Sequence, residues 1–482
     1  MNVLLVTLDQ FRGDSLSAAG HPVVRTPHLD ALAADGVRLA RHYSQAAPCS
    51  PGRACLYTGT YQMNNRVVAN GTPLDDRFDN VARAARRAGY DPVLFGYTDQ
   101  GIDPRLADGP DDPRLSDYEG VLPGFSVALD LSHDRDWHAS LAELGYGPFE
   151  SRDHTLATEP DRPAEHSISA FTTDRLIEWL RRRDPPWFVH ASYLRPHPPY
   201  AAAGEWSRAY DPDAVPLPVS PAARLHPFHE GALSIPLAAA PRDERGQREM
   251  RAQYYGMIGE VDHQLGRVWD ALRELDQWDD TFVLVTSDHG EQLGDHGLVQ
   301  KLGWFEASYH VLGIVRDPRH PEAHGGAVHE FTENVDVFPT LCEVMDVEIP
   351  AQCDGLPLTP FLRGETPEWW RDAAHWEFDW RDMALRTHEY PWPWDRRPER
   401  MHLAVRRDAA TQYVQFGDGS WLCYDLATDP TGRTEICEPA VVLPLAQDML
   451  AWRSEHADRT MTGMLLENGG IGRWPPTREH AS

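Results

Sequence analysis

Long apolar runs, cysteine pairs and basic clusters are what this 482-residue sequence lacks. No stretch approaches the roughly 20 apolar residues that a membrane span requires, so we expect a water-soluble protein without a membrane partner. The six cysteines are scattered and none lies in a Cys-x-x-Cys pair, which argues against disulfides and against a structural zinc site. Basic residues number 45 against 74 acidic ones. The net charge of −29 argues against nucleic acid as a partner, because a phosphate backbone binds clustered positive charge.

The chain opens on a strand-like stretch and not on an export signal. Residues 1–9 carry no basic segment, no long apolar core and no small-residue cleavage site. If this stretch is the first core strand, nothing ahead of it can be read by an export machinery. We therefore expect a cytoplasmic location.

Short apolar runs recur along the first two thirds of the sequence. Near-continuous runs of this length suit strands that are buried on both faces of a parallel or mixed sheet. Helical signals alternate with them, which indicates a layered α/β domain. The predicted strands are residues 3–8, 92–96, 187–193, 281–286 and 312–315. The predicted helices are residues 27–35, 82–88, 167–182 and 253–275.

The length also predicts a second, smaller domain, since single cores seldom grow beyond about 250 to 300 residues. Residues 198–248 are rich in proline and alanine with little periodicity, and we interpret them as a long surface excursion. We predict a catalytic α/β domain at 1–365 and a small domain of antiparallel sheet and helix at 366–482. The elements expected in the small domain are strands at 402–407, 412–416 and 420–424 and a helix near 443–455.

The pentapeptide Cys-Ser-Pro-Gly-Arg at residues 49–53, followed by Leu-Tyr-Thr-Gly at 56–59, is the most informative motif in the chain. Taken alone, it would fit a buried structural cysteine ahead of a helix. Together with the segments described below, it resembles the signature of the sulfatase family, Cys-x-Pro-x-Arg with a Leu-x-Thr-Gly-like tail. In that family the cysteine is oxidised to formylglycine. The resemblance implies a formylglycine derived from Cys49 and a formylglycine-generating enzyme as maturation partner.

The surroundings of Cys49 suit an anion on physical grounds. Pro51 can occupy the first position of a helix, which would place residue 49 at a helix N-terminus, where free N–H groups and the helix dipole favour negative charge. A hydrated aldehyde at residue 49 offers one hydroxyl to attack sulfur or phosphorus and a second to expel the covalent half-ester. Arg53, one helical turn further on, is placed to hold the ionised nucleophile.

Two acidic pairs follow two of the predicted strands, Asp9 with Gln10 and Asp288 with His289. Ligands gather at the carboxyl ends of strands in open α/β sheets, so these distant segments could converge. The later pair and the run after it also resemble the second metal segment of the family. We expect Asp9, Asp288, His289 and a hydroxyl of the modified Cys49 to hold one divalent metal ion, with Gln10 nearby as a substrate-binding residue. One imidazole among oxygens favours Mn²⁺ or Zn²⁺ over Ca²⁺ or Mg²⁺.

Further donors complete the expected site. His197 resembles the histidine that protonates the leaving group in the family, and Lys301 resembles its substrate-binding lysine. Either could donate that proton, and we place His197 first. Asn70 is a candidate donor to a substrate oxygen, although a plain Asn-Gly turn explains it equally well on spacing.

Departures from the family pattern bear on the substrate. Where many sulfatases carry a Gly-Lys-x-His segment, this chain reads Gly-Tyr-Thr-Asp at 96–99, which leaves Tyr97, Thr98 and Asp99 as local candidates for the base that breaks down the covalent intermediate. With the Asn-Gly-Thr-Pro run at 70–73, this looks like the phosphonate monoester hydrolase and phosphodiesterase branch. Choline-sulfatase-like members share the Asp-Gln and Asp-His pairs.

The resemblance covers most of the chain and implies a fold and an activity. The implied fold is an alkaline-phosphatase-like α/β sandwich, with a large mixed, mainly parallel sheet between helices and a small C-terminal α+β domain. The implied activity is hydrolysis of sulfate monoesters of the arylsulfatase type, with cross-activity on phosphonate monoesters and phosphodiesters, since all three small anionic esters carry one negative charge on a tetrahedral centre. The alternative is that phosphonate monoesters or phosphodiesters are the main substrates. Family habit adds a homo-oligomer, a dimer or a tetramer.

Two rival readings remain open from the sequence. In the first, Cys49 stays unmodified and a metal-bound water attacks a phosphodiester. In the second, the fold survives as a catalytically silent scaffold, which the joint presence of the nucleophile, the acidic pairs, His197 and Lys301 argues against.

Overall fold

Strand β1 (Asn2–Leu8) lies inside an eight-stranded sheet of the computed structural model, which describes residues 1–117, 119–133, 135–381 and 397–457. Strand β8 runs antiparallel to both of its neighbours, β7 and β2, and the other pairs are parallel. In order across the sheet, the strands are β5 (Ser126–Asp130), β4 (Pro92–Gly96), β6 (Phe188–Tyr193), β1, β7 (Thr281–Thr286), β8 (Gly313–Arg316), β2 (Val37–Tyr43) and β9 (Gly326–Glu333).

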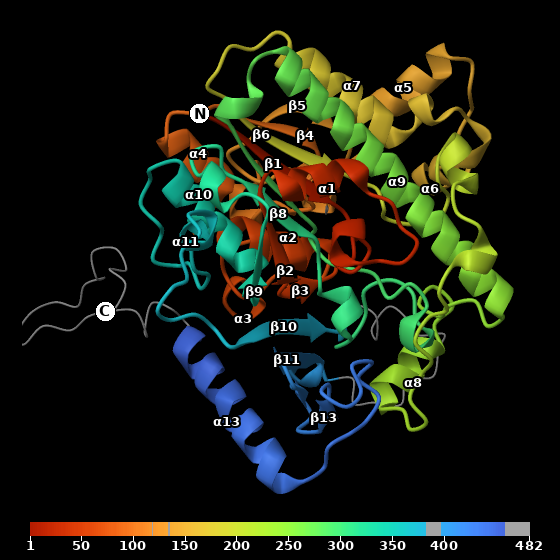
Figure 1. Cartoon of the computed structure of the whole chain (residues 1–482), viewed down its shortest axis with the longest axis vertical. Helices are drawn as coiled ribbons and strands as arrows, with labels where there is room; N and C mark the ends of the chain where they lie inside the picture. Colours follow the sequence, from red (N-terminus) through yellow and green to blue (C-terminus); the bar gives the residue numbers. More distant parts are fainter. Residues whose placement is uncertain (118, 134, 382–396, 458–482) are drawn as a thin grey trace, which may run out of the picture.

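The sheet is covered by helices on both faces (Figure 1). Because successive side chains of a strand point to opposite faces, Leu4 and Val6 of β1 belong to one apolar core and Val3 and Leu5 to the other. The first core is closed by α1 (Pro27–Ala34), α7 (Ile168–Leu180) and α9 (Glu244–Glu274). The second is closed by α2 (Cys49–Thr58), α4 (Val81–Arg87), α10 (Val337–Val344) and α11 (Thr359–Leu362).

A smaller five-stranded sheet packs beside this sandwich (Figure 1). Its order is β13 (Trp421–Asp425), β12 (Thr411–Phe416), β11 (His402–Asp408), β10 (Ala373–Asp379) and β3 (Ala46–Ala47). Helix α13 (Pro439–His456) contributes Leu445, Met449 and Trp452 to the core under it. The predicted fold class, an α/β sandwich with a large, mainly parallel sheet and a smaller C-terminal sheet domain, is confirmed. The boundary at residue 366 stays a prediction, and the predicted end at 482 lies outside the described residues.

Strand β3 links the small sheet to the large domain. It comes directly before Cys49 in the chain, and its two residues pair in parallel with Glu377 and Phe378 of β10. The backbone that leads into helix α2 is therefore fixed by the small sheet.

Most predicted elements are confirmed within a residue or two, but two predictions are wrong. Helix α9 begins at Glu244 and not near residue 253, because its first turns are polar and show no apolar periodicity; the side chain of Asp243 caps it by accepting from the Gly246 N–H. The excursion at 198–248 therefore ends in helix, and it also contains α8 (Pro227–Leu233). The described residues also form the short helices α3 (Gln62–Asn65), α5 (Arg135–Glu143) and α6 (Arg152–Ala157).

Helix α2 starts at Cys49, which confirms that this residue stands at a helix N-terminus. The N-cap is Pro48, so Pro51 is the third helical residue and not the first. Gly52 allows the helix to approach the site closely, since a Cβ there would lie 2.5 Å from the Asp288 carbonyl oxygen and 2.9 Å from that of Ala46.

Among the described residues, no helix is both long and apolar enough to cross a membrane.

We expect Gly52→Ala to destabilise the protein by about 1 to 3 kcal/mol and to lower any activity of the site, because the added methyl meets backbone atoms that cannot turn away. Gly101→Ala is the matched control: its Cβ would meet only the Pro73 Cα, at 3.8 Å. Thermal and urea unfolding of both variants measure the difference. Equal stability of Gly52→Ala and the wild type would show that α2 does not need this close approach.

Candidate active site

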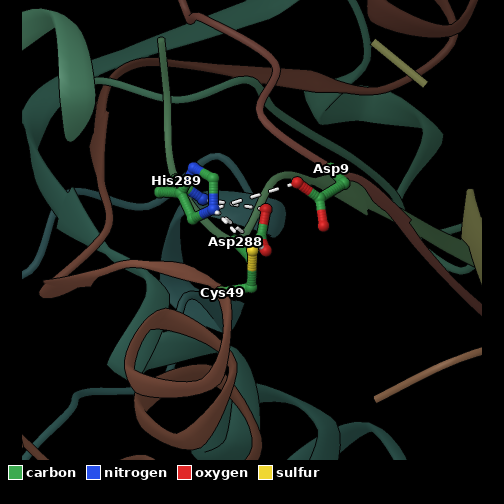
Figure 2. A group of neighbouring side chains, drawn as sticks. All are labelled: Asp9, Cys49, Asp288 and His289. Carbon is green, nitrogen blue, oxygen red and sulfur yellow. Dashed lines mark hydrogen bonds and ion pairs between the residues drawn. The ribbon is translucent and has the colours of Figure 1, made fainter. Parts of the chain in front are cut away.

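Four buried side chains from three segments meet at the carboxyl ends of two neighbouring strands. Asp9 follows β1, Asp288 and His289 follow β7, and Cys49 lies at the start of α2. Their potential ligand atoms all lie within 4.8 Å of one another. Figure 2 shows the four side chains pointing toward one another. The structure thus brings together all four residues for which the sequence predicted a metal.

Arg53 holds the two carboxylates in place. Its Nη2 donates to Oδ2 of Asp9 at 3.0 Å and its Nε to Oδ2 of Asp288 at 3.1 Å, and the side chain is completely buried. Nη1 donates to the Ser192 hydroxyl at 2.8 Å and to the Tyr97 carbonyl at 3.2 Å. In this structure Arg53 therefore serves the carboxylates, and its expected role as a holder of the ionised nucleophile stays a prediction.

The donor set fits a divalent cation. Oδ1 of Asp9 is buried and has no hydrogen-bond partner. Nδ1 of His289 lies 3.0 Å from the Gly290 carbonyl oxygen and must donate to it, so the lone pair on Nε2 turns toward the cluster, 3.3 Å from the Cys49 sulfur. Burial and the charge of Asp9 raise the pKa of Asp288 to about 7, a strain that a doubly positive ion between the carboxylates would relieve.

Lys301 brings a positive charge to the same place. Its Nζ donates to Oε1 of Gln10 at 2.7 Å and lies 3.4 Å from the Cys49 sulfur. Burial opposes the charge, but Cys49, Asp9 and Asp288 raise the pKa of the lysine above its usual value, so it is an ammonium. Gln10 was expected to contact substrate, whereas both ends of its amide are engaged by protein: Oε1 accepts from Lys301 and Nε2 donates to Glu291.

A cavity of about 650 Å³ opens over this cluster. It gives an ester access to the buried end of α2 and to several of the expected donors. The residues of the expected site that line it are Asp9, Cys49, Asn70, Tyr97, Asp99, His197 and Lys301.

Asn70 lies in a turn and also lines the cavity, and its role as a donor to a substrate oxygen stays a prediction. The Thr72 N–H donates to the Ala69 carbonyl at 3.0 Å and Gly71 has φ of 87°, so residues 69–72 do form a turn. The Asn70 Oδ1 also accepts from the Ser50 N–H at 3.0 Å, at the start of α2. Because the oxygen is engaged, the amide NH₂ is the end that remains to donate into the cavity.

His197 lies in the loop after β6, at the cavity wall. Its Nδ1 lies 2.7 Å from the Pro198 carbonyl oxygen and carries the proton of the neutral ring, so Nε2 is the nitrogen that can gain or give a proton. Burial lowers the pKa of this ring to about 3. The loop is pinned by the buried Arg195, which donates to the carbonyls of His197 and Pro199 at 2.8 and 3.0 Å.

The three candidates for the base differ sharply in placement. The Tyr97 hydroxyl donates to Oδ2 of Asp9 at 2.6 Å, and its ring covers the Arg53 guanidinium at 4.4 Å. Asp99 lines the cavity with a carboxylate oxygen 3.7 Å from Nε of Arg53, and burial raises the pKa of Asp99 to about 8.

Thr98 points elsewhere. Its hydroxyl donates to the Gly120 carbonyl at 2.9 Å and accepts from the Leu122 N–H at 2.8 Å, so it holds a loop and does not face Cys49. Tyr97 and Asp99 are therefore the candidates that the geometry favours.

The family can now be assigned from comparison with known proteins. The Sulfatase family profile matches residues 1–347, and the profile described as N-sulphoglucosamine sulphohydrolase, C-terminal, matches residues 294–452. The chain belongs to the sulfatase family.

Relatives of this sulfatase-family protein include enzymes named for phosphorus esters. It is 43% identical to a phosphonate monoester hydrolase of Agrobacterium radiobacter of known structure, with a TM-score of 0.90 over 98% of this chain and 100% of the other. A phosphonate monoester hydrolase from Silicibacter pomeroyi is 34% identical, with a TM-score of 0.87 over 98% and 99%. The multifunctional alkaline phosphatase superfamily protein PehA of Trinickia caryophylli is 36% identical over 99% of both chains. The protein is thus a hydrolase of the sulfatase family, within the alkaline phosphatase superfamily.

We expect Arg53→Gln to lower the free energy of unfolding of metal-free protein by about 3 to 5 kcal/mol, because it leaves two buried carboxylates without their cation. Arg87→Gln removes a half-exposed arginine that pairs with Asp79 and should cost no more than about 1 kcal/mol. Chemical unfolding of both variants after chelation gives the comparison. If the two losses were alike, Arg53 would not be what stabilises the carboxylate pair.

Proposed function

We propose that this sulfatase is a formylglycine-dependent metallohydrolase of phosphonate monoesters and phosphodiesters, with sulfate monoesters as a second substrate class. The observation that carries the chemistry is the buried cluster of Asp9, Cys49, Asp288 and His289, of which Asp9 and Cys49 line the cavity. The order of substrates reverses the one expected from the sequence. Its support is the similarity to phosphonate monoester hydrolases at 43% and 34% identity over nearly the whole chain.

The charge at the site suits a singly charged ester. The two carboxylates that would hold an ion are offset by Arg53, which lies between them, and by Lys301. The two positive charges of a divalent ion would therefore be balanced by one ester anion and one ionised nucleophile. A phosphate monoester dianion would need additional positive charge at the site, and we expect it to be the poorer substrate.

A divalent ion and a formylglycine would supply part of the chemistry. When bound by Asp9, Asp288 and His289, a divalent ion would polarise the ester oxygens. A formylglycine at residue 49 would offer, as its hydrate, an oxygen nucleophile in place of sulfur. The oxygen and nitrogen donors keep Mn²⁺ or Zn²⁺ as the favoured ions.

The roles of the remaining residues follow from their placement. Lys301 would bind an ester oxygen beside residue 49, and the NH₂ of Asn70 would donate to another. His197, at the wall of the cavity, would protonate the leaving oxygen from Nε2; because the neutral ring carries its proton on Nδ1, Nε2 must first be protonated, which the charge of a bound ester anion would favour. Asp99, whose raised pKa lies near neutrality, is our proposed base at residue 49, with Tyr97 holding Asp9.

The setting of the protein completes the proposal. We infer maturation by a formylglycine-generating enzyme, a cytoplasmic location and a homodimer or tetramer. These rest on the sequence pattern and on family habit.

The peptide that contains residue 49 should be about 18 Da lighter than its cysteine form in active protein, and Cys49→Ala should abolish turnover. Cys55→Ala, a buried cysteine in the same helix, is the control and should keep both the lighter peptide and activity. Peptide mass spectrometry, with kcat/KM on a phosphonate monoester, a phosphodiester and a sulfate monoester, provides the readout.

Unmodified cysteine in fully active protein would contradict this mechanism and favour the phosphodiesterase in which a metal-bound water attacks. A kcat/KM that is highest for the sulfate monoester would return sulfate esters to first place.

A further inference from the structure

Glu291, two residues beyond His289, is completely buried, and its carboxylate is surrounded by donors, the Tyr200 hydroxyl among them. Its Oε1 accepts from the backbone N–H groups of Leu293 and Gln300, both at 2.7 Å. Its Oε2 accepts from the side-chain amide nitrogen of Gln10. Both lone-pair-bearing oxygens are thus engaged, and the carboxylate acts purely as an acceptor.

The backbone of Gln10 is fixed independently of its side chain. Its N–H donates to Oδ1 of Asp288 at 3.2 Å, and its carbonyl accepts from the Tyr254 hydroxyl at 2.7 Å. The freedom that remains is a half-turn of the amide, which would exchange the oxygen and the NH₂ group.

Glu291 decides between these two orientations. With NH₂ toward Glu291, the amide oxygen faces Lys301, whose ammonium donates to it at 2.7 Å. After a half-turn, the oxygen would face a carboxylate and the NH₂ would face an ammonium, which are two repulsive contacts in a buried place.

We propose that Glu291 is a positioning residue of this hydrolase: by fixing the direction of the Gln10 amide it holds the Lys301 ammonium beside residue 49. Within the described part of the chain, Nζ of Lys301 forms hydrogen bonds to Gln10 and Cys49. The Gln10 amide oxygen is therefore the acceptor that holds the ammonium from the side opposite residue 49. The inference rests on the proposed function only where turnover is the readout.

The critical variant is Glu291→Gln. The new side-chain oxygen can still accept from Leu293 and Gln300, which turns its NH₂ toward Gln10 and forces the Gln10 amide over. The Lys301 ammonium then faces the NH₂ group of Gln10 and loses its hydrogen bond to the amide oxygen. We expect kcat/KM to fall by roughly 10- to 100-fold, as for other residues that orient a catalytic group, together with some loss of thermal stability, because a buried ammonium loses its acceptor.

A reciprocal swap separates orientation from general damage. In the double variant Gln10→Glu with Glu291→Gln, the carboxylate at position 10 accepts from the NH₂ at 291 and from Lys301, so each hydrogen bond is restored with the atoms exchanged. We expect it to recover most of the activity. Gln10→Glu alone places two carboxylates in contact and should be impaired. Glu260→Gln, another buried glutamate that accepts from the Ser167 hydroxyl, is the control and should keep full turnover.

Three results would overturn the proposal: Glu291→Gln within twofold of wild-type kcat/KM, a folded double variant no better than Glu291→Gln, or Gln10→Leu at full turnover. The last variant leaves the two backbone contacts of Glu291 intact and so decides the matter even if Glu291→Gln does not fold. A crystal structure of Glu291→Gln serves independently of activity, because Lys301 should have left Oε1 of Gln10. Inactive wild-type protein would contradict the proposed function instead, and that structure would still test the role of Glu291.

Discussion

The contact on which the site depends is that of one guanidinium with two carboxylates. Arg53 joins the ends of β1 and β7 to the first turns of α2, because its side chain extends from the helix and forms ion pairs with both Asp9 and Asp288. Without this cation, two like charges would face each other in a region from which water is excluded, and the sheet edge could not hold them. With it, one oxygen of Asp9 and the lone pair of His289 remain available to an ion.

The rest of the fold positions Arg53 and Cys49, which lies one helical turn before it. Parallel neighbours β1 and β7 end at the same edge, which is why segments 279 positions apart in sequence meet at residues 9 and 288. Helix α2 reaches them because Gly52 presents no side chain to the Asp288 backbone. Strand β3, which pairs with β10 of the small sheet, fixes the chain just before Cys49. The small domain is therefore part of how the nucleophile is placed.

The sequence could predict the buried strands and the polar residues that follow them. The inner strands are near-continuous apolar runs, and the polar residues after two of them predicted Asp9, Asp288 and His289 as ligands. Cys49 and Lys301 were predicted from the resemblance to the sulfatase family. Strands β2 and β9 were missed because charged residues interrupt their apolar residues, so neither reads as a continuous apolar run. The direction of the Gln10 amide and the role of Glu291 were also missed. Both depend on which neighbouring group donates a hydrogen bond to which, and residue spacing does not determine this. Glu291 nevertheless lies in the same motif as Asp288 and His289. Thr98, a plausible base by position, turns out to hold a loop.

We propose that Asp9, Asp288, His289 and an oxygen at residue 49 hold one ion, and X-ray absorption at the metal edge of purified protein is the first measurement to make. We expect one ion per chain with an oxygen and nitrogen shell at about 2.0 to 2.2 Å, an imidazole signature that disappears in His289→Ala, and no sulfur shell. A sulfur shell near about 2.3 Å would place an unmodified Cys49 on the ion, and an imidazole signature that survives His289→Ala would place the ion elsewhere.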